Sequence, residues 1–156
     1  MNIRHTALPL VLVLACASAH AGNCKTIRGE LFEIAATEGC NPGLASCFLG
    51  AVHANHGLSG ITHFNADSGA AGPATSPGFV SYGGAFEYRT AHGTIYARET
   101  GVTDPGVVTA FQKIVDGTGK YRGASGHFFV SGFKTGSGAE TTVTTDLIGE
   151  ICYASD

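Results

Sequence analysis

Short runs of apolar and β-branched residues, each about the length of a β-strand, follow one another from residue 25 onward. Gly, Pro, Asn or Asp separates one run from the next, and no amphipathic helix longer than about two turns fits between them. Strands joined by such short connections must pair antiparallel, because parallel neighbours need crossovers of about a dozen residues. The runs occupy residues 27–34, 47–54, 57–65, 79–90, 94–101, 107–115, 124–133 and 141–153.

These eight runs predict an all-β fold, a single eight-stranded antiparallel up-and-down β-barrel. Closing the barrel removes exposed strand edges and brings the first strand beside the last. The composition agrees, because 23 glycines and only 13% charged residues suit a tightly turned β protein better than a helical one. Residues 67–78 are small and flexible, which predicts a long loop, either a solvated tether or a lid.

The N-terminus has the pattern of a secretory signal. Arg4 precedes an apolar run over residues 7–17, and Ala19-His20-Ala21 supplies small residues at a cleavage site. The run is too short for a membrane-spanning helix, which needs about 20 residues. The prediction is therefore a signal peptide at 1–21, a barrel domain at 22–156, and a secreted or periplasmic protein. A lipoprotein anchored through Cys16 is the alternative.

Four cysteines remain after the signal peptide, and an even number in an exported chain indicates disulfides. Three connectivities are possible. The favoured one joins Cys40 to Cys47 across a short loop and leaves Cys24 for Cys152, which would tie together the two ends of a closed barrel. Neither these cysteines nor the five histidines at 53, 56, 63, 92 and 127 have the close spacing typical of metal sites, so no metal is expected.

Charge and motifs exclude several function classes. With Arg4 removed, eight of the nine Lys and Arg residues face twelve acidic ones, which argues against a nucleic-acid partner. Gly117-Thr-Gly-Lys120 is not a phosphate-binding loop, because Tyr121 stands where Ser or Thr is required. Arg122 likewise occupies the place of the third glycine of a dinucleotide fingerprint. No cofactor is expected.

Residues 87–100 form the most polar predicted strand pair and contain the candidate ligand-binding residues Tyr88, Tyr96 and Arg98. Period-two alternation puts Tyr96 and Arg98 on one face with Thr100, and Glu99 on the other with Ile95 and Ala97. If the Tyr and Arg face points inward, the barrel has a cavity lined by hydrogen-bonding groups. If it points outward, these residues are ordinary surface pairs.

Residues 115–126, Val-Asp-Gly-Thr-Gly-Lys-Tyr-Arg-Gly-Ala-Ser-Gly, resemble the G-G-T-G-[RK]-[FY]-x-G-A-x-G hairpin of dirigent proteins and the related allene oxide cyclase-like barrels, departing at Asp116. Residues 94–102 and 149–153 are similar to segments of secreted bacterial proteins of this group. The resemblance implies turn geometry and packing. It assigns positive φ angles to Gly117, Gly119, Gly123 and Gly126, and gives Tyr121 the place of a plug at one barrel end.

Plant members of this group steer cyclisation or radical coupling of apolar small molecules inside the barrel. The resemblance therefore implies a secreted barrel that binds a small apolar ligand, with a cyclase-type enzyme as the first alternative. The second alternative is an envelope or extracellular interaction module whose barrel is filled by side chains. No catalytic residue can be carried over from the matched hairpin, and whether the protein is an enzyme stays open, as does its oligomeric state.

Overall fold

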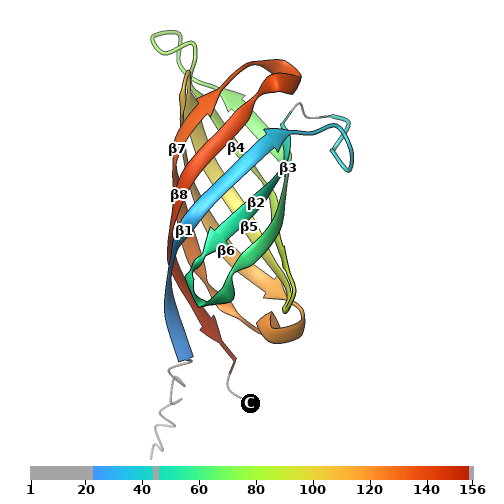
Figure 1. Ribbon diagram of the computed structural model, residues 1–156. Helices are drawn as coiled ribbons and strands as arrows, with labels where there is room; N and C mark the ends of the chain where they lie inside the picture. The colour runs from blue at the N-terminus through green and yellow to red at the C-terminus, as the bar shows by residue number, and fades with distance from the viewer. Residues whose placement is uncertain (1–22, 44–45, 155–156) are drawn as a thin grey trace, which may run out of the picture.

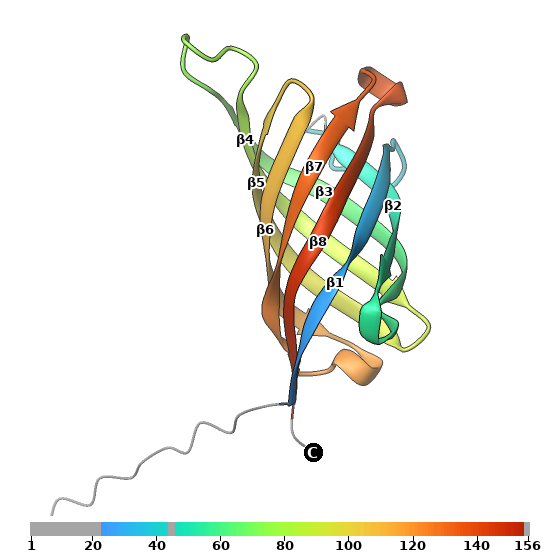
Figure 2. The ribbon, with the colours of Figure 1, turned by 60° about the vertical axis from the view of Figure 1, so that its left-hand side comes forward.

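The computed structural model describes residues 23–43 and 46–154, which form a closed antiparallel barrel with eight strands in sequence order (Figures 1 and 2). The predicted fold is confirmed. The strands are β1 (Asn23–Ala35), β2 (Cys47–Ala54), β3 (Ser59–Ala71), β4 (Val80–Thr90), β5 (Gly93–Asp104), β6 (Val107–Gly117), β7 (Ser125–Thr135) and β8 (Thr142–Tyr153). Among the described residues, three single-turn 3₁₀ helices lie in the connections: η1 (Asn55–Gly57), η2 (Gly119–Tyr121) and η3 (Gly138–Glu140).

The first and last strands close the barrel over their whole length. Antiparallel pairing of β1 with β8 runs from Asn23 opposite Tyr153 to Ile34 opposite Thr142. Cys24 and Cys152 are direct cross-strand neighbours with Cα atoms 3.9 Å apart, and they form a disulfide. The second disulfide joins Cys40 to Cys47. Both favoured pairings are therefore confirmed.

The loops divide between two ends of the barrel, as Figure 1 shows. The start of β1, the end of β8, η1 and η2 lie at the lower end of that view, and the connections after β1, β3, β5 and β7 lie at the upper end. The loop predicted at 67–78 is shorter than expected. Residues up to Ala71 continue β3, and a β-bulge between Ala66 and Ser68 lets the strand keep its pairing with β4. Glycine and alanine content misled the prediction, because backbone hydrogen bonds to β4 hold this segment.

Large inward side chains fill the lower half of the barrel. Phe86, Tyr88 and Phe128 are fully buried and pack edge to face or tilted, with ring centroids 4.8 and 5.5 Å apart. The other members of this core include Ile27, Leu31, Val52, Ile95, Leu147 and Ile151. At the lower end Tyr121 in η2 is buried against this cluster and stacks with Tyr153 at 6.2 Å. The predicted plug is thus present.

The hairpin between β6 and β7 has mostly the expected backbone. Positive φ angles occur at Gly119, Gly123 and Gly126. Gly117 differs from the prediction, since it does not have a positive φ. A Cβ atom there would lie 2.8 Å from the Cβ of Tyr121, so Gly117 is needed for the close approach of the plug.

The predicted signal peptide and Cys16 lie outside the described residues. Within the described part of the chain, no helix is long and apolar enough for a membrane crossing.

Candidate functional site

A cavity of about 550 Å³ occupies the upper half of the barrel and opens at the upper end. Its walls come from all eight strands, and they are mostly apolar. Small and medium side chains such as Ala66, Val108, Val130 and Val143 line it, in contrast to the large rings below. Phe64 and Tyr82 meet edge to face at 5.6 Å and lie between the cavity and the aromatic core. The barrel is therefore solid below and hollow above.

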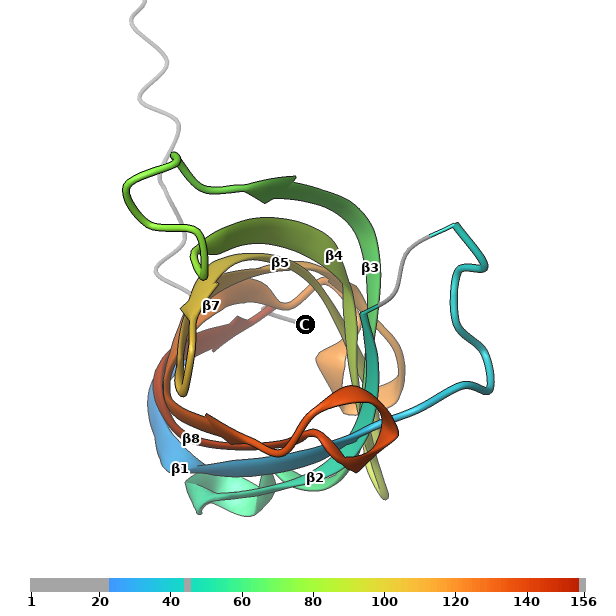
Figure 3. The ribbon, with the colours of Figure 1, turned by 90° about the horizontal axis from the view of Figure 1, so that it is seen from above.

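Two carboxyl groups line this cavity from opposite walls. Glu33 belongs to β1 and Glu99 to β5, and these strands are four apart in either direction around the closed barrel (Figure 3). Their exposed fractions are only 7% and 5%. Neither makes an ion pair with a Lys, Arg or His among the described residues, where the ion pairs are Arg89–Glu87 and Arg98–Asp67 on the outside. Two buried carboxyl groups without a cation are unusual in a barrel core.

A chain of hydrogen bonds connects Glu99 to the aromatic core. The Gln112 side-chain amide donates to Glu99 Oε2, and the Tyr88 hydroxyl donates to Gln112 Oε1. Gln112 is cross-strand neighbour to Glu99, so the register of β5 and β6 sets this contact. The two partners fix the orientation of the amide, because its nitrogen can only donate and its oxygen only accept. Glu99 is thus held in place from below.

Glu33 has no comparable support: the Thr62 hydroxyl beside it favours its ionised form, but the two groups do not meet in hydrogen-bonding geometry. Its Oε1 atom has no hydrogen-bond partner among the described residues, and the same holds for the nearby hydroxyls of Thr62 and Thr145. Gly50, the cross-strand neighbour of Glu33, makes room for it, because a Cβ there would lie 2.7 Å from Glu33 Cγ and 2.8 Å from Thr62 Oγ1. A buried polar atom without a partner is costly, so this oxygen is available to a group that enters the cavity.

Burial controls the protonation of both acids. It raises the pKa of Glu99 to about 7, against the opposing effect of the Gln112 amide and the Tyr82 hydroxyl, which favour the ionised form. Burial, and secondly the charge of Glu99, raises the pKa of Glu33 well above its ordinary value. The same two causes raise the pKa values of the phenols of Tyr82 and Tyr88, which stay protonated. The site can therefore accept or donate a proton near neutral pH.

The structure separates the three predicted ligand-binding residues. Tyr88 points inward, where it is fully buried beneath the cavity and reaches the site through Gln112. Tyr96 and Arg98 lie on the outside of β5 and do not line the cavity. Arg98 crosses over Gly83 on β4 to pair with Asp67 on β3. Its guanidinium lowers the pKa of Asp67 by direct hydrogen bonding. The outward alternative thus applies to Tyr96 and Arg98.

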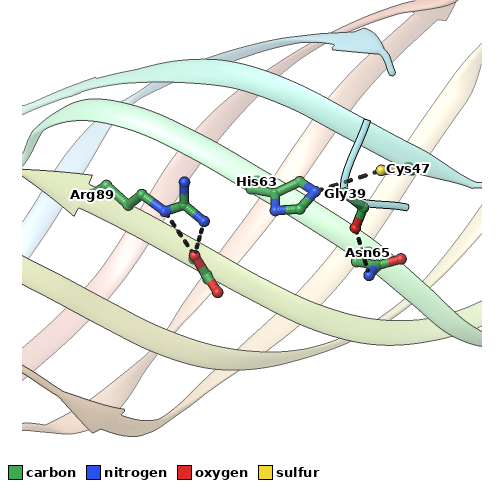
Figure 4. Close-up of polar contacts among 6 residues, drawn as sticks. Gly39, Cys47, His63, Asn65 and Arg89 are labelled. Atoms are coloured by element: carbon green, nitrogen blue, oxygen red, sulfur yellow. Dashed lines mark hydrogen bonds and ion pairs between the residues drawn. The ribbon is translucent and has the colours of Figure 1, made fainter. Parts of the chain in front are cut away.

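Polar contacts on the outer face hold the loop after β1 beside the cavity mouth (Figure 4). Asn65 Nδ2 donates to the Gly39 carbonyl at 3.2 Å, and the Asn41 amide donates to Asn65 Oδ1 at 2.8 Å. The Cys47 sulfur of the disulfide lies 3.5 Å from His63 Nε2. Further along β4, Arg89 Nε donates to Glu87 at 2.8 Å. The disulfide and Asn65 together fix this rim of the mouth.

Sequence reasoning placed Glu99 on a face with Ile95 and Ala97 but did not select it. The pattern that could have identified Glu99 is an acidic residue that alternates with apolar residues on the same face of a strand. Glu33 shows the same pattern with Ile27 and Leu31. A carboxyl group on the apolar face of a strand points into the core, and two such strands predict a buried acidic pair.

Metal-ligand side chains gather at one place in the described residues, where Cys24, Glu150 and Cys152 lie together. The two sulfurs form the disulfide, so they offer no thiolate.

No protein-family model matches the sequence, and no curated protein matches it significantly. The resemblance to dirigent and allene oxide cyclase-like barrels therefore stays a prediction.

Proposed function

We propose that the protein binds one small, mainly apolar molecule in the upper cavity of the barrel. The observation that carries this proposal is the hollow upper half, where small side chains replace the large rings of the lower core. A volume of about 550 Å³ lies within the range of small-molecule sites. Apolar walls with a few polar groups are typical of such sites, since the polar groups fix the orientation of the ligand.

The position of the polar groups supports binding over a structural role. Glu33, Glu99 and Thr145 line the cavity instead of pairing with each other or facing solvent. A barrel that serves only as an interaction module gains nothing from buried acids, because their burial costs free energy. The solid-core alternative also leaves the cavity without an explanation. Secretion, suggested by the N-terminal pattern, places the proposed ligand outside the cytoplasm.

The test is a titration with N-phenyl-1-naphthylamine, a small neutral dye whose fluorescence rises in apolar surroundings. We expect one molecule to bind per barrel. Val130→Trp places an indole ring in the cavity and should weaken binding about tenfold or more. The matched control is Ser131→Trp, because Ser131 is the next residue of β7 and points outward. It should bind the dye like the wild type.

Circular dichroism spectra and melting curves of both variants verify that each is folded before binding is compared. Absence of dye binding by the folded wild type would contradict the proposal. So would equal binding by Val130→Trp, since the dye would then occupy the outer surface.

A cyclase-type enzyme is the second candidate, and the hydrogen-bonded Glu99 favours it. A carboxyl group with a pKa of about 7 can act as general acid and base at neutral pH. The cavity would orient an apolar intermediate while Glu99 transfers a proton. To separate the candidates, molecules extracted from the purified protein are identified by mass spectrometry. A compound released unchanged indicates a binding protein, whereas conversion of that compound by the protein, lost in Glu99→Gln, indicates an enzyme.

A further inference from the structure

We infer that the ligand carries a basic nitrogen, and that its ammonium group sits between Glu33 and Glu99. This inference rests on the proposed function, because it names the chemical class of the molecule that enters the same cavity. The expected ligand is thus a cationic amphiphile, an amine with an apolar body. The recognition elements are the two carboxyl groups and the unpartnered oxygens around them.

The charges around the cavity favour a cationic ligand. Glu33 and Glu99 project from β1 and β5 into one cavity, and no cation of the described chain is paired with either of them. Lys134 lines the cavity but makes no ion pair with either acid among the described residues. The charge of Glu99 disfavours ionisation of Glu33, and a cation between the two carboxyl groups would relieve this repulsion. A ligand ammonium would supply that cation.

The unpartnered atoms around the cavity favour a ligand group that donates hydrogen bonds. Four buried side-chain atoms of the described residues have no hydrogen-bond partner: the Tyr121 hydroxyl at the lower end and, around the cavity, Glu33 Oε1 and the hydroxyl oxygens of Thr62 and Thr145. An ionised carboxyl group can only accept hydrogen bonds, and the hydroxyls can accept as well as donate. An ammonium group has several donors and no acceptor, so it can satisfy these oxygens. The remaining acid, Glu99, accepts from Gln112 through Oε2, and the Tyr82 hydroxyl also favours its ionised form.

The surroundings of the two acids fit an amine that carries an apolar body. Glu99 lies where the cavity meets the aromatic core, because Gln112 connects it to the buried Tyr88, and Phe64 and Tyr82 line the cavity beside this core. A ligand that places its amine at this depth leaves its apolar part along Val108, Val130 and Val143 toward the mouth. Charged pairs removed from water are stronger than the same pairs at the surface. The apolar part and the amine then contribute to binding together.

The test uses octylamine, octanol and octanoate as displacers of bound N-phenyl-1-naphthylamine. At about pH 8 the amine is protonated and Glu99, with its pKa of about 7, is mostly ionised. Octylamine should bind about tenfold or more tightly than octanol, as read from the concentration of each that displaces the dye. The two molecules have the same chain, and only the amine is charged. Octanoate should be the weakest.

Glu33→Gln keeps the shape of the side chain and removes the carboxyl group that would pair with the ligand ammonium, so it should lower the preference for octylamine over octanol about tenfold. Octanol affinity should stay within about a factor of three, which shows that the cavity is intact. The matched control is Glu30→Gln, because Glu30 lies on the same strand and is exposed outside the barrel. It should keep the full preference for the amine.

The outcomes separate the two proposals. Dye and octanol binding without preference for octylamine would overturn this inference and leave the proposed function standing. A preference for octanoate would also overturn it, and would indicate that Lys134 at the mouth selects the ligand. A failure of the dye and of every displacer to bind would overturn the proposed function together with the inference.

Discussion

Side chains inside the barrel differ in whether their buried polar atoms have hydrogen-bond partners. Tyr88 and Gln112 have their hydrogen bonds, whereas Glu33 Oε1 has none among the described residues. A satisfied buried group stabilises the fold, and an unsatisfied one is tolerated where a ligand replaces the missing partner. At this scale the structure predicts effects on stability that depend on which face of a strand a residue occupies.

Removing one hydroxyl from the buried chain should destabilise the protein. Tyr88→Phe leaves Gln112 Oε1 without its donor, and an unpaired buried acceptor costs about 1 to 3 kcal/mol. Tyr96→Phe is the matched control, because Tyr96 lies on the outside of β5 and the loss there should be within about 0.5 kcal/mol. Urea unfolding of the wild type and both variants measures the difference. Equal stabilities of the two variants would contradict the assigned role of Tyr88.

The buried acid Glu99 should make stability depend on pH. Between pH 4.5 and about 7 the unfolded chain ionises this group while the folded chain keeps it protonated. The free energy of unfolding should therefore fall as the pH rises through this range, by about 3 kcal/mol for Glu99. The raised pKa of Glu33 acts in the same direction.

Urea unfolding at several pH values tests this dependence. Glu99→Gln cannot ionise, so its stability should fall less steeply between pH 4.5 and about 7 than that of the wild type. Glu30→Gln, on the outside of the same barrel, should follow the wild-type curve. A wild-type stability that rises over this range would show that Glu99 is not held protonated.

At the level of strands, the pairing of the first strand with the last closes the barrel. β1 and β8 pair along their length, and the Cys24–Cys152 disulfide links them across 128 residues of sequence. The alternation within each strand then decides what faces the cavity. Strand number, antiparallel order and cysteine pairing could all be predicted from the sequence, because short turns and an even cysteine count leave few alternatives.

The face of β5 and the end of β3 were harder to predict. An alternating strand has two faces, and the sequence gives Tyr96 and Arg98 a face as plausible as that of Ile95 and Glu99. The packing of the closed barrel decides which face of β5 points inward. Ile95 is buried, and Glu99 lies on the same face of the strand, so Glu99 is buried as well. The small residues at 67–71 were assigned to a loop, since side chains carry little strand signal where backbone pairing with β4 holds the segment.

Removing the disulfide between β1 and β8 should cost more than removing the short one. Loop closure over 128 residues predicts a contribution of about 4 to 5 kcal/mol, against about 2 to 3 kcal/mol for the separation of seven between Cys40 and Cys47. Cys24→Ser and Cys152→Ser should lower the melting temperature equally, because each breaks the same bond. Calorimetry under oxidising conditions measures this. Unequal losses in these two variants would indicate a different pairing.

The whole molecule is a barrel with two different halves. The lower half, closed by Tyr121, has a continuous aromatic and aliphatic core, and the upper half has a cavity with an acidic pair at its depth. The lower core stabilises the fold, which allows the upper half to remain hollow. The outer surface carries Arg98 and its partner Asp67, so these residues should not influence binding in the cavity.

The most direct test of the account is a crystal structure of the protein with bound N-phenyl-1-naphthylamine. We expect density for one dye molecule inside the upper half of the barrel, in contact with Phe64 and Val130 and above the fully buried Tyr88. Density for the dye only on the outer face, or an upper half filled by side chains, would contradict the proposed binding site.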